Sequence, residues 1–126
     1  MDGFDVIHSY SRAQAIEDGV LVDVTATARE AGFKHHTVIT EGVQGACVTL
    51  TRAAREAGND EKGRLWDVVF MASMAVRRAR GGDRVSFKVA VVTEDAENPE
   101  EMGLYVHIGP GDKGEPVLTI MLDGED

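Results

Sequence analysis

The sequence predicts an α+β fold in which a helical N-terminal half packs on a three-stranded antiparallel β-meander in the C-terminal part. Apolar residues recur at helical spacing through the first part of the chain and most densely over residues 63–82. After Gly82 the pattern changes to strict alternation over three short segments. Loops without helices join these segments, which indicates antiparallel pairing. A chain of 126 residues suits one core, so we expect residues 1–126 to form a single domain.

The chain begins with short elements. Residues 4–10 read as a strand or an extended arm, and Ser11 to Gln14 form an S-x-x-Q capping box that predicts a short helix through about Glu17. The apolar run at 20–24 fits either a strand or the apolar side of a turn, and the sequence leaves both open.

Two helical segments are expected next. Residues 25–32 predict a helical turn that ends at a glycine, and Val38-Ile39 form a two-residue apolar step before Thr40. Thr40 is a suitable N-cap, so residues 41–57 are expected to form one helix, which Gly42 and Gly45 weaken.

The longest apolar run, residues 63–82, predicts the core helix. Its apolar residues cover nearly every side, which is typical of a helix that is buried on most sides. Three arginines, Arg77, Arg78 and Arg80, lie where a helix C-terminus favours positive charge, and two glycines follow. These arginines could neutralise part of the acidic C-terminal region within the fold. The run is too short and too charged at its ends to span a bilayer.

Strands are expected at residues 85–91, 103–108 and 116–122, with an acidic loop at 93–102 between the first two. The turn at 109–115 contains a G-x-G-x-x-G pattern. A dinucleotide site needs a helix after this pattern, whereas here a strand follows, and Pro110 lacks an N–H that a phosphate would use. The pattern therefore predicts a hairpin turn.

The charge is unevenly distributed. Residues 1–92 contain 12 acidic and 12 basic residues, whereas residues 93–126 contain 10 acidic residues and only Lys113, so the net charge of −9 lies in the last part of the chain. Such a surface repels phosphates, which argues against direct nucleic acid binding. It suits a protein partner with a basic surface. The alternative is a solvated loop and tail that keep the protein soluble.

The sequence favours no enzyme, cofactor or metal site. None of the four histidines has the spacing of a zinc motif, and Cys47 lies on the apolar stripe of an expected helix. Asp67 is expected to form a structural ion pair, with either Arg64 or an arginine of the first half of the chain as its partner. A small metal-dependent enzyme would need distant groups to converge, with the candidates being His8, Asp23, Asp67 and His107.

The N-terminus shows no secretory signal, and a single cysteine excludes an intrachain disulfide, so we expect a cytoplasmic protein without a membrane anchor. The candidate partner-binding residues are carboxylates of the last part of the chain. Two aromatic residues, Tyr105 and His107, lie on the other side of their strand from its apolar residues, where they are either exposed or covered. The carboxylates are Glu94, Asp95, Glu97, Glu100, Glu101, Asp112, Glu115 and Asp123.

A resemblance to a known family rests on three stretches: YSRAQAIEDGVLVDVTATAREAGFK (residues 10–34), GRLWDVVFMA (63–72) and HIGPGDKGEPVLTIML (107–122). They resemble small uncharacterised proteins encoded on bacterial plasmids, integrative elements and phages. The acidic segment 93–102 is less typical of that family, which has no assigned catalytic residues. The resemblance implies a protein encoded on a mobile element. Such elements encode inhibitors of host defence, which include anti-CRISPR proteins.

The expected function is therefore that of a non-enzymatic inhibitor that docks on a Cas complex through an acidic face. The alternative is a plasmid or phage accessory or regulatory protein that acts through a protein partner or as a homodimer. The first depends on the carboxylates, and the second depends on an exposed apolar patch. Both a monomer and a homodimer fit the sequence.

Overall fold

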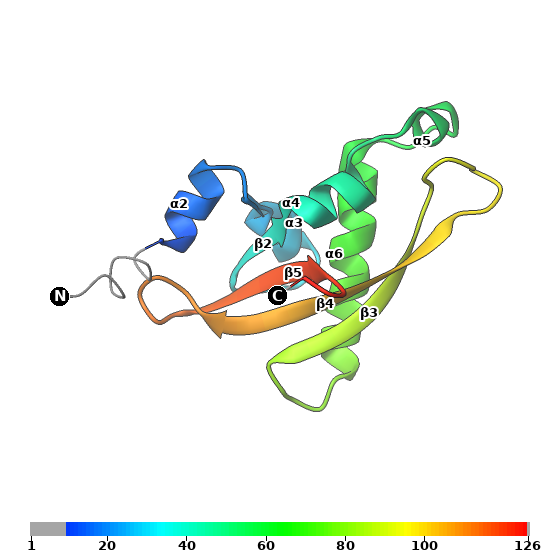
Figure 1. The fold of residues 1–126 in the computed structure, drawn as a ribbon. Helices are drawn as coiled ribbons and strands as arrows, with labels where there is room; N and C mark the ends of the chain where they lie inside the picture. The colour runs from blue at the N-terminus through cyan, green and yellow to red at the C-terminus, as the bar shows by residue number, and fades with distance from the viewer. Residues whose placement is uncertain (1–9, 126) are drawn as a thin grey trace.

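A five-stranded mixed sheet organises the protein in the computed structural model, which describes residues 10–125 (Figure 1). The strands lie in the order β1-β2-β5-β4-β3. The predicted three-stranded antiparallel meander is wrong, because two more strands extend it and one of them, β2, runs parallel to β5. The strands are β1 (Leu21–Asp23), β2 (His36–Thr40), β3 (Arg84–Val91), β4 (Glu100–Pro110) and β5 (Pro116–Leu122).

The meander itself forms one side of this sheet. β3 pairs with β4 and β4 pairs with β5, both antiparallel, as the alternating pattern predicted. The register places Val106 between Val85 and Ile120, so apolar residues of all three strands share one face. The turn at 109–115 joins β4 to β5, and Pro110 pairs with Pro116, which confirms the predicted hairpin.

The run at 20–24, which the sequence left open, contains β1, and this strand pairs with β2 rather than with the meander. β2 includes the apolar step Val38-Ile39 and lies between β1 and β5. The strand or arm expected at residues 4–10 falls, except for Tyr10, outside the described residues.

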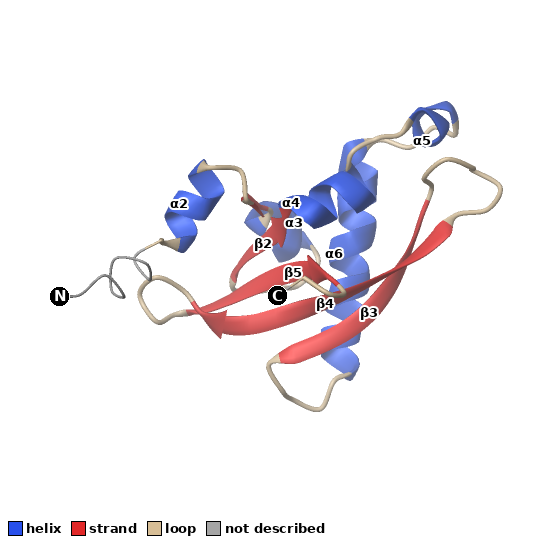
Figure 2. Ribbon diagram, in the orientation of Figure 1, coloured by secondary structure: helices blue, strands red, loops and turns tan. Residues whose placement is uncertain are grey.

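Helices cover one face of the sheet (Figure 2). The expected helix over 41–57 is wrong: the chain forms one α-helical turn, a π-helical turn, and then a separate helix that Thr51 caps. The capping box at Ser11 is confirmed, and Thr40 caps α4 as expected. The helices are α2 (Arg12–Glu17), α3 (Thr25–Glu30), α4 (Glu41–Val43), η1 (Gln44–Val48), α5 (Arg52–Glu56) and α6 (Glu61–Arg78).

The core lies between α6 and the sheet. Val68, Val69 and Ala72 of α6 are fully buried and belong to one cluster with Leu104 and Ile120 of the meander. α6 is thus the core helix that the sequence predicted, although its outer side keeps some large apolar residues in solvent. In the described part of the chain, no helix combines the length and the apolar character needed to cross a membrane.

The opposite face of the sheet is partly covered by the C-terminal turn. Tyr105 is only 1% exposed, and its hydroxyl donates to the carbonyl of Glu125. The Arg84 guanidinium lies 3.6 Å from the centre of the Tyr105 ring. Glu125 Oε2 also accepts from Thr40 Oγ1 at 2.8 Å and from the N–H of Leu122 at 2.7 Å. The C-terminal segment is therefore a packed part of the fold.

Candidate protein-binding surface

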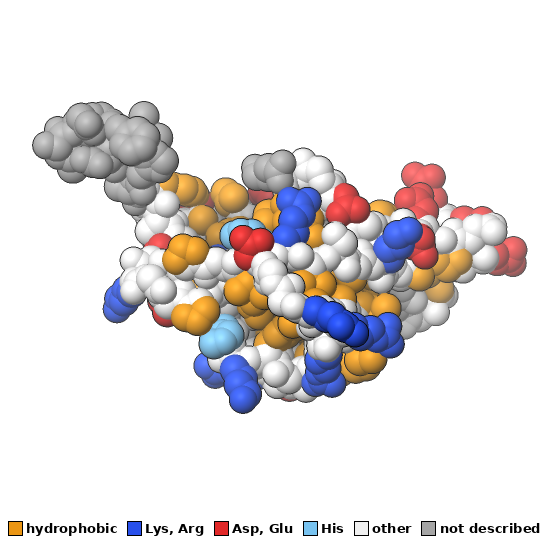
Figure 3. Space-filling view, turned by 90° about the horizontal axis from the view of Figure 1, so that it is seen from below, with side chains coloured by type: hydrophobic (Ala, Val, Ile, Leu, Met, Phe, Trp, Pro, Cys, Tyr) orange, Lys and Arg blue, Asp and Glu red, His pale blue; other side chains and the backbone are white. Residues whose placement is uncertain are grey.

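The most prominent charged feature is the hairpin that joins β3 to β4, here called the acidic hairpin (residues 94–101). It projects beyond the body of the sheet near α5 (Figure 1). Acidic side chains gather at this end of the molecule in Figure 3. Because β4 starts earlier than the sequence predicted, two of the carboxylates stand on the strand rather than in the loop. All five predicted carboxylates here are exposed: Glu94, Asp95, Glu97, Glu100 and Glu101.

Hydrogen bonds hold the acidic hairpin in one shape. Asp95 accepts from Asn98 Nδ2 at 2.7 Å and from the N–H of Glu97 at 2.9 Å. These bonds, first that of Asn98 and then that of Glu97, lower the pKa of Asp95 below its usual value. Thr93 Oγ1 donates to Glu100 at 3.2 Å, and the Thr51 hydroxyl donates to the carbonyl of Thr93. The loop is therefore ordered before any partner binds, which limits the entropy that binding must remove.

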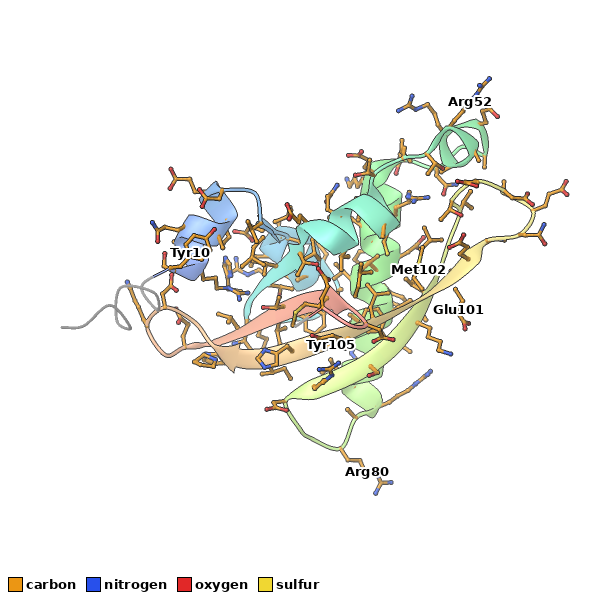
Figure 4. The ribbon with its side chains drawn as sticks, viewed as in Figure 1. Tyr10, Arg52, Arg80, Glu101, Met102 and Tyr105 are labelled. Carbon is orange, nitrogen blue, oxygen red and sulfur yellow. The ribbon has the colours of Figure 1, made fainter. Side chains whose placement is uncertain are left out.

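The carboxylates of the acidic hairpin are largely uncompensated. Lys88 Nζ lies 3.4 Å from Glu101 Oε1, and no other ion pair between described residues involves the hairpin. The sequence suggested that the arginines at the basic end of α6 neutralise part of the acidic region. In the structure they do not neutralise the acidic hairpin. Arg80 lies in the loop after α6, at the far end of the meander from Glu101 (Figure 4). Arg77 instead donates to the carbonyl of Ala31 at 3.3 Å.

The other three predicted site residues lie outside the acidic hairpin. Asp112 and Glu115 belong to the β4–β5 turn, whereas the acidic hairpin joins the other end of β4. Asp123 follows β5, and its N–H donates to the carbonyl of Gly103 on β4 at 3.0 Å. Its carboxylate lies over Gly103, where a Cβ atom would clash with it. The structure therefore brings Asp123 to β4 but separates Asp112 and Glu115 from the hairpin.

Asp112 has a structural role at the start of α2. Its two carboxylate oxygens accept from the N–H of Arg12 at 2.8 Å and from the N–H of Ala13 at 3.1 Å. These two bonds lower the pKa of Asp112 below its usual value. Glu115 stabilises the turn itself, because its Oε1 accepts from the N–H of Lys113 at 3.0 Å. We therefore assign these two carboxylates to the fold.

A small hollow of about 210 Å³ lies beside this turn. Arg12 lines it and donates to Thr119 Oγ1 at 2.9 Å and to the carbonyl of Leu118 at 2.7 Å. His36 lines the hollow, and its Nε2 lies 3.2 Å from Asp23 Oδ2. The lining combines the Arg12 guanidinium with the carboxylates of Asp112 and Glu115, so the hollow favours neither an anion nor a cation.

Asp23 forms the other half of this Asp–His pair. Burial raises its pKa, but hydrogen bonds from Thr25 and the nearby His36 outweigh burial, so the pKa lies below its usual value. Thr25 donates twice to Asp23 Oδ1, from its hydroxyl at 2.6 Å and from its N–H at 2.9 Å. The pair fastens β1 to β2 at one edge of the sheet.

The residues of the metal-enzyme alternative are dispersed. Asp23 lies on β1, Asp67 on α6 and His107 on β4, and His8 is outside the described residues. No three His, Cys, Asp or Glu side chains within residues 10–125 are placed to hold a metal ion. Cys47 is buried as predicted, and burial raises the pKa of its thiol to about 11.

The expected ion pair of Asp67 is wrong, because Asp67 pairs neither with Arg64 nor with another arginine among the described residues. Arg64 is only 5% exposed and donates to main-chain carbonyls, with Nε 3.2 Å from Val48 O and Nη1 2.8 Å from Val92 O. Asp67 remains exposed on α6. Arg64 thereby connects the end of η1 to the end of β3, directly below the acidic hairpin.

One surface feature escaped sequence reasoning, a groove between α6 and β3. It has a volume of about 550 Å³, and Met71, Met74 and Val85 contribute to its apolar wall. The strand alternation at β3 and the helical pattern of α6 each predicted apolar faces. Neither pattern could show that the two faces leave a gap at the edge of the sheet.

The fold and its surface thus define a small α+β protein with a mixed five-stranded sheet and an ordered acidic hairpin. The chain belongs to DUF6573, a family of unknown function, whose model matches residues 1–126. No curated protein and no solved structure matched the chain.

Proposed function

We propose that the protein is a non-enzymatic binding protein that docks its acidic hairpin on a basic surface of a protein partner. The observation that carries this proposal is the ordered, exposed and mostly unpaired set of carboxylates at the hairpin. Charged groups arranged in this way steer association and select complementary partners. The same charge disfavours nucleic acid, because the phosphate backbone is negative.

The class of partner follows from the sequence resemblance to mobile-element proteins. Such proteins include inhibitors of host defence, so we propose a Cas complex in the cytoplasm as the partner to test first. A Cas complex has basic grooves that bind nucleic acid strands. A protein that fills such a groove with carboxylates would inhibit the complex by excluding its nucleic acid.

The test is a co-purification from cells that contain Cas and restriction systems. The variant Glu97→Gln/Glu100→Gln/Glu101→Gln removes three hairpin charges and keeps the size of each side chain. We expect it to lose affinity for the captured partner by at least about tenfold.

The matched control is Glu17→Gln/Glu30→Gln/Glu61→Gln, which removes three exposed charges outside the acidic hairpin. It should bind within about twofold of the native protein. Equal binding and equal inhibition by the hairpin variant and the control would refute docking through the acidic hairpin.

A second candidate function is that of an accessory protein that acts as a homodimer. The observation that favours it is the apolar groove beside β3, whose Met71 is 40% exposed. Such a dimer would form at the edge of the sheet beside this groove, where β3 is the last strand.

A further inference from the structure

The starting point is the outer edge of the sheet. β3 is the last strand in the order β1-β2-β5-β4-β3, so it pairs with β4 on one side and with no strand of residues 10–125 on the other. The N–H of Ile108 donates to the carbonyl of Asp83 at 2.8 Å, which makes these two residues a hydrogen-bonded pair. Because bonding alternates along an antiparallel ladder, the main-chain groups of Ser86, Lys88 and Ala90 point away from β4. An edge of this kind can accept another strand.

The groove between α6 and β3 runs along this edge. Met71, on α6, is 40% exposed there, which is unusual for a large apolar side chain in the middle of a core helix. Methionine side chains adapt to the shape of a partner and are common at binding surfaces. Apolar residues of α6 and β3 line most of the groove, and Ser86, Arg78, Lys88 and Glu101 contribute its polar and charged part.

An outward lysine on an edge strand usually opposes further pairing. Here Lys88 is paired, because its Nζ lies 3.4 Å from Glu101 of the neighbouring strand. The charge that would repel an incoming strand is therefore partly neutralised inside the protomer. The edge strand therefore keeps its outward hydrogen-bonding groups, and the charge of Lys88 opposes the pairing of another strand less strongly.

We propose that a second copy of this chain occupies the edge, with β3 of each protomer pairing antiparallel around a two-fold axis. The two sheets would then form one continuous sheet, and the two apolar grooves would face each other across the axis. An interface of this symmetry uses the same patch on both copies.

Charge complementarity supports a second copy over an unrelated strand. Along each protomer the basic end of α6, with Arg78 and Arg80, and the acidic hairpin lie at opposite ends of β3 (Figure 4). Antiparallel pairing brings the basic end of each copy to the acidic end of the other. Opposite charges therefore meet twice in one dimer, as in other electrostatically complementary interfaces.

The same charges select a register. Pairing Ser86 with Ser86 of the second copy would place Arg84 opposite Lys88, and like charges directly opposite each other are destabilising. A shift that pairs Ser86 with Lys88 places Arg84 opposite Ala90 instead. It also brings Glu94 to the level of Arg80, so we infer this register.

The dimer is tested with purified protein alone, by sedimentation equilibrium and native mass spectrometry over a range of concentrations. Met71→Glu places a charge in the groove, and Ser86→Pro removes an outward N–H at an edge position where proline is tolerated. We expect each change to weaken dimerisation by at least about tenfold. Unchanged far-ultraviolet circular dichroism would show that both variants fold.

Phe70→Glu is the matched control, because Phe70 is 41% exposed on the same helix but does not line the groove. It should dimerise within about twofold of the native protein. A native protein that stays monomeric up to about 1 mM, or a dimer that neither variant weakens, would overturn the proposal. A monomer that binds an unrelated extended peptide at β3 would also overturn the assignment to a second copy.

The dimer does not depend on the proposed docking of the acidic hairpin. Met71→Glu separates the two, because it lies in the groove and leaves every charge of the acidic hairpin in place, and the dimerisation assay contains no partner. Loss of partner capture with an intact dimer would therefore concern the acidic hairpin. A native protein that is monomeric and still captures a partner would contradict only the dimer at the edge of the sheet.

Discussion

Asp112 has a different role in the structure from the one that the sequence predicted. In the sequence it is one of several acidic residues near the C-terminus, and it was predicted to contact a partner. In the structure it binds two N–H groups of α2, about 100 residues earlier in the chain. The capping box at Ser11 is local and could be predicted, whereas a carboxylate from a distant turn leaves no local pattern.

The lowered pKa of Asp112 predicts how its contribution depends on pH. A carboxyl whose pKa is lower in the folded than in the unfolded state stabilises the protein at pH values above its ordinary pKa of about 3.9. That stabilisation is lost as the pH falls through the lowered pKa. We expect Asp112→Asn to reduce the urea midpoint at pH 7 and to have a progressively smaller effect below about pH 4.

Urea unfolding of the native protein and of Asp112→Asn at several pH values measures this difference in the urea midpoint. Asp83→Asn, at another exposed position, is the control and should follow the native pH profile. A difference between native protein and Asp112→Asn that stays constant from pH 7 to about pH 2 would contradict the assigned role.

At the scale of elements, strand β2 is the largest departure from the sequence prediction. A strand that is buried on both faces shows no alternation, because apolar residues face both ways. Thr37, Val38 and Ile39 are all buried, so the sequence showed only a short apolar step. The parallel pairing of β2 with β5 joins distant parts of the chain, and local periodicity contains no information about it. The strands of the meander alternate and could be predicted.

The interrupted helix at 41–57 has a related cause. Its apolar residues fit one helical face, but Gly42 and Gly45 weaken the helix, and Thr51 can cap a new one. Arg64 completes the break, because it donates to the carbonyl of Val48, where η1 ends. The glycines that weaken the helix are visible in the sequence of this segment, whereas the arginine that binds its freed carbonyl comes from α6.

Arg64 is therefore expected to be important for the junction of η1, α6 and β3. Arg64→Met keeps much of the aliphatic volume but leaves the carbonyls of Val48 and Val92 without a donor. We expect a loss of about 3 kcal/mol in the free energy of unfolding, since bonds to a charged donor are lost in a buried site. Urea unfolding at pH 7 measures it.

Arg52→Met is the control for this change. Arg52 is exposed on α5, and among the described residues it pairs only with Glu56, at 3.0 Å, so its replacement should cost less than about 0.5 kcal/mol. If Arg64→Met costs no more than Arg52→Met, the bonds to the carbonyls do not hold this junction.

At the scale of the whole molecule, the charge asymmetry of the sequence becomes a set of separate regions. The acidic residues after residue 92 divide among the acidic hairpin, the β4–β5 turn and the C-terminal segment. The sequence predicted one acidic face, but within residues 10–125 only the acidic hairpin presents a dense and mostly unpaired group. Local spacing identified its residues, because they are consecutive in the chain. In the folded chain, structural contacts are made instead by Asp112, Glu115 and Glu125.

The central claim is that the acidic hairpin binds a basic surface, and the most direct test is how the affinity depends on salt. We would measure the dissociation constant of the captured complex between about 50 mM and about 500 mM salt, where the Debye length falls severalfold. The account predicts that native affinity falls by at least about tenfold, and that Glu97→Gln/Glu100→Gln/Glu101→Gln binds more weakly at low salt with a flatter dependence. The same affinity and the same salt dependence for both proteins would contradict it.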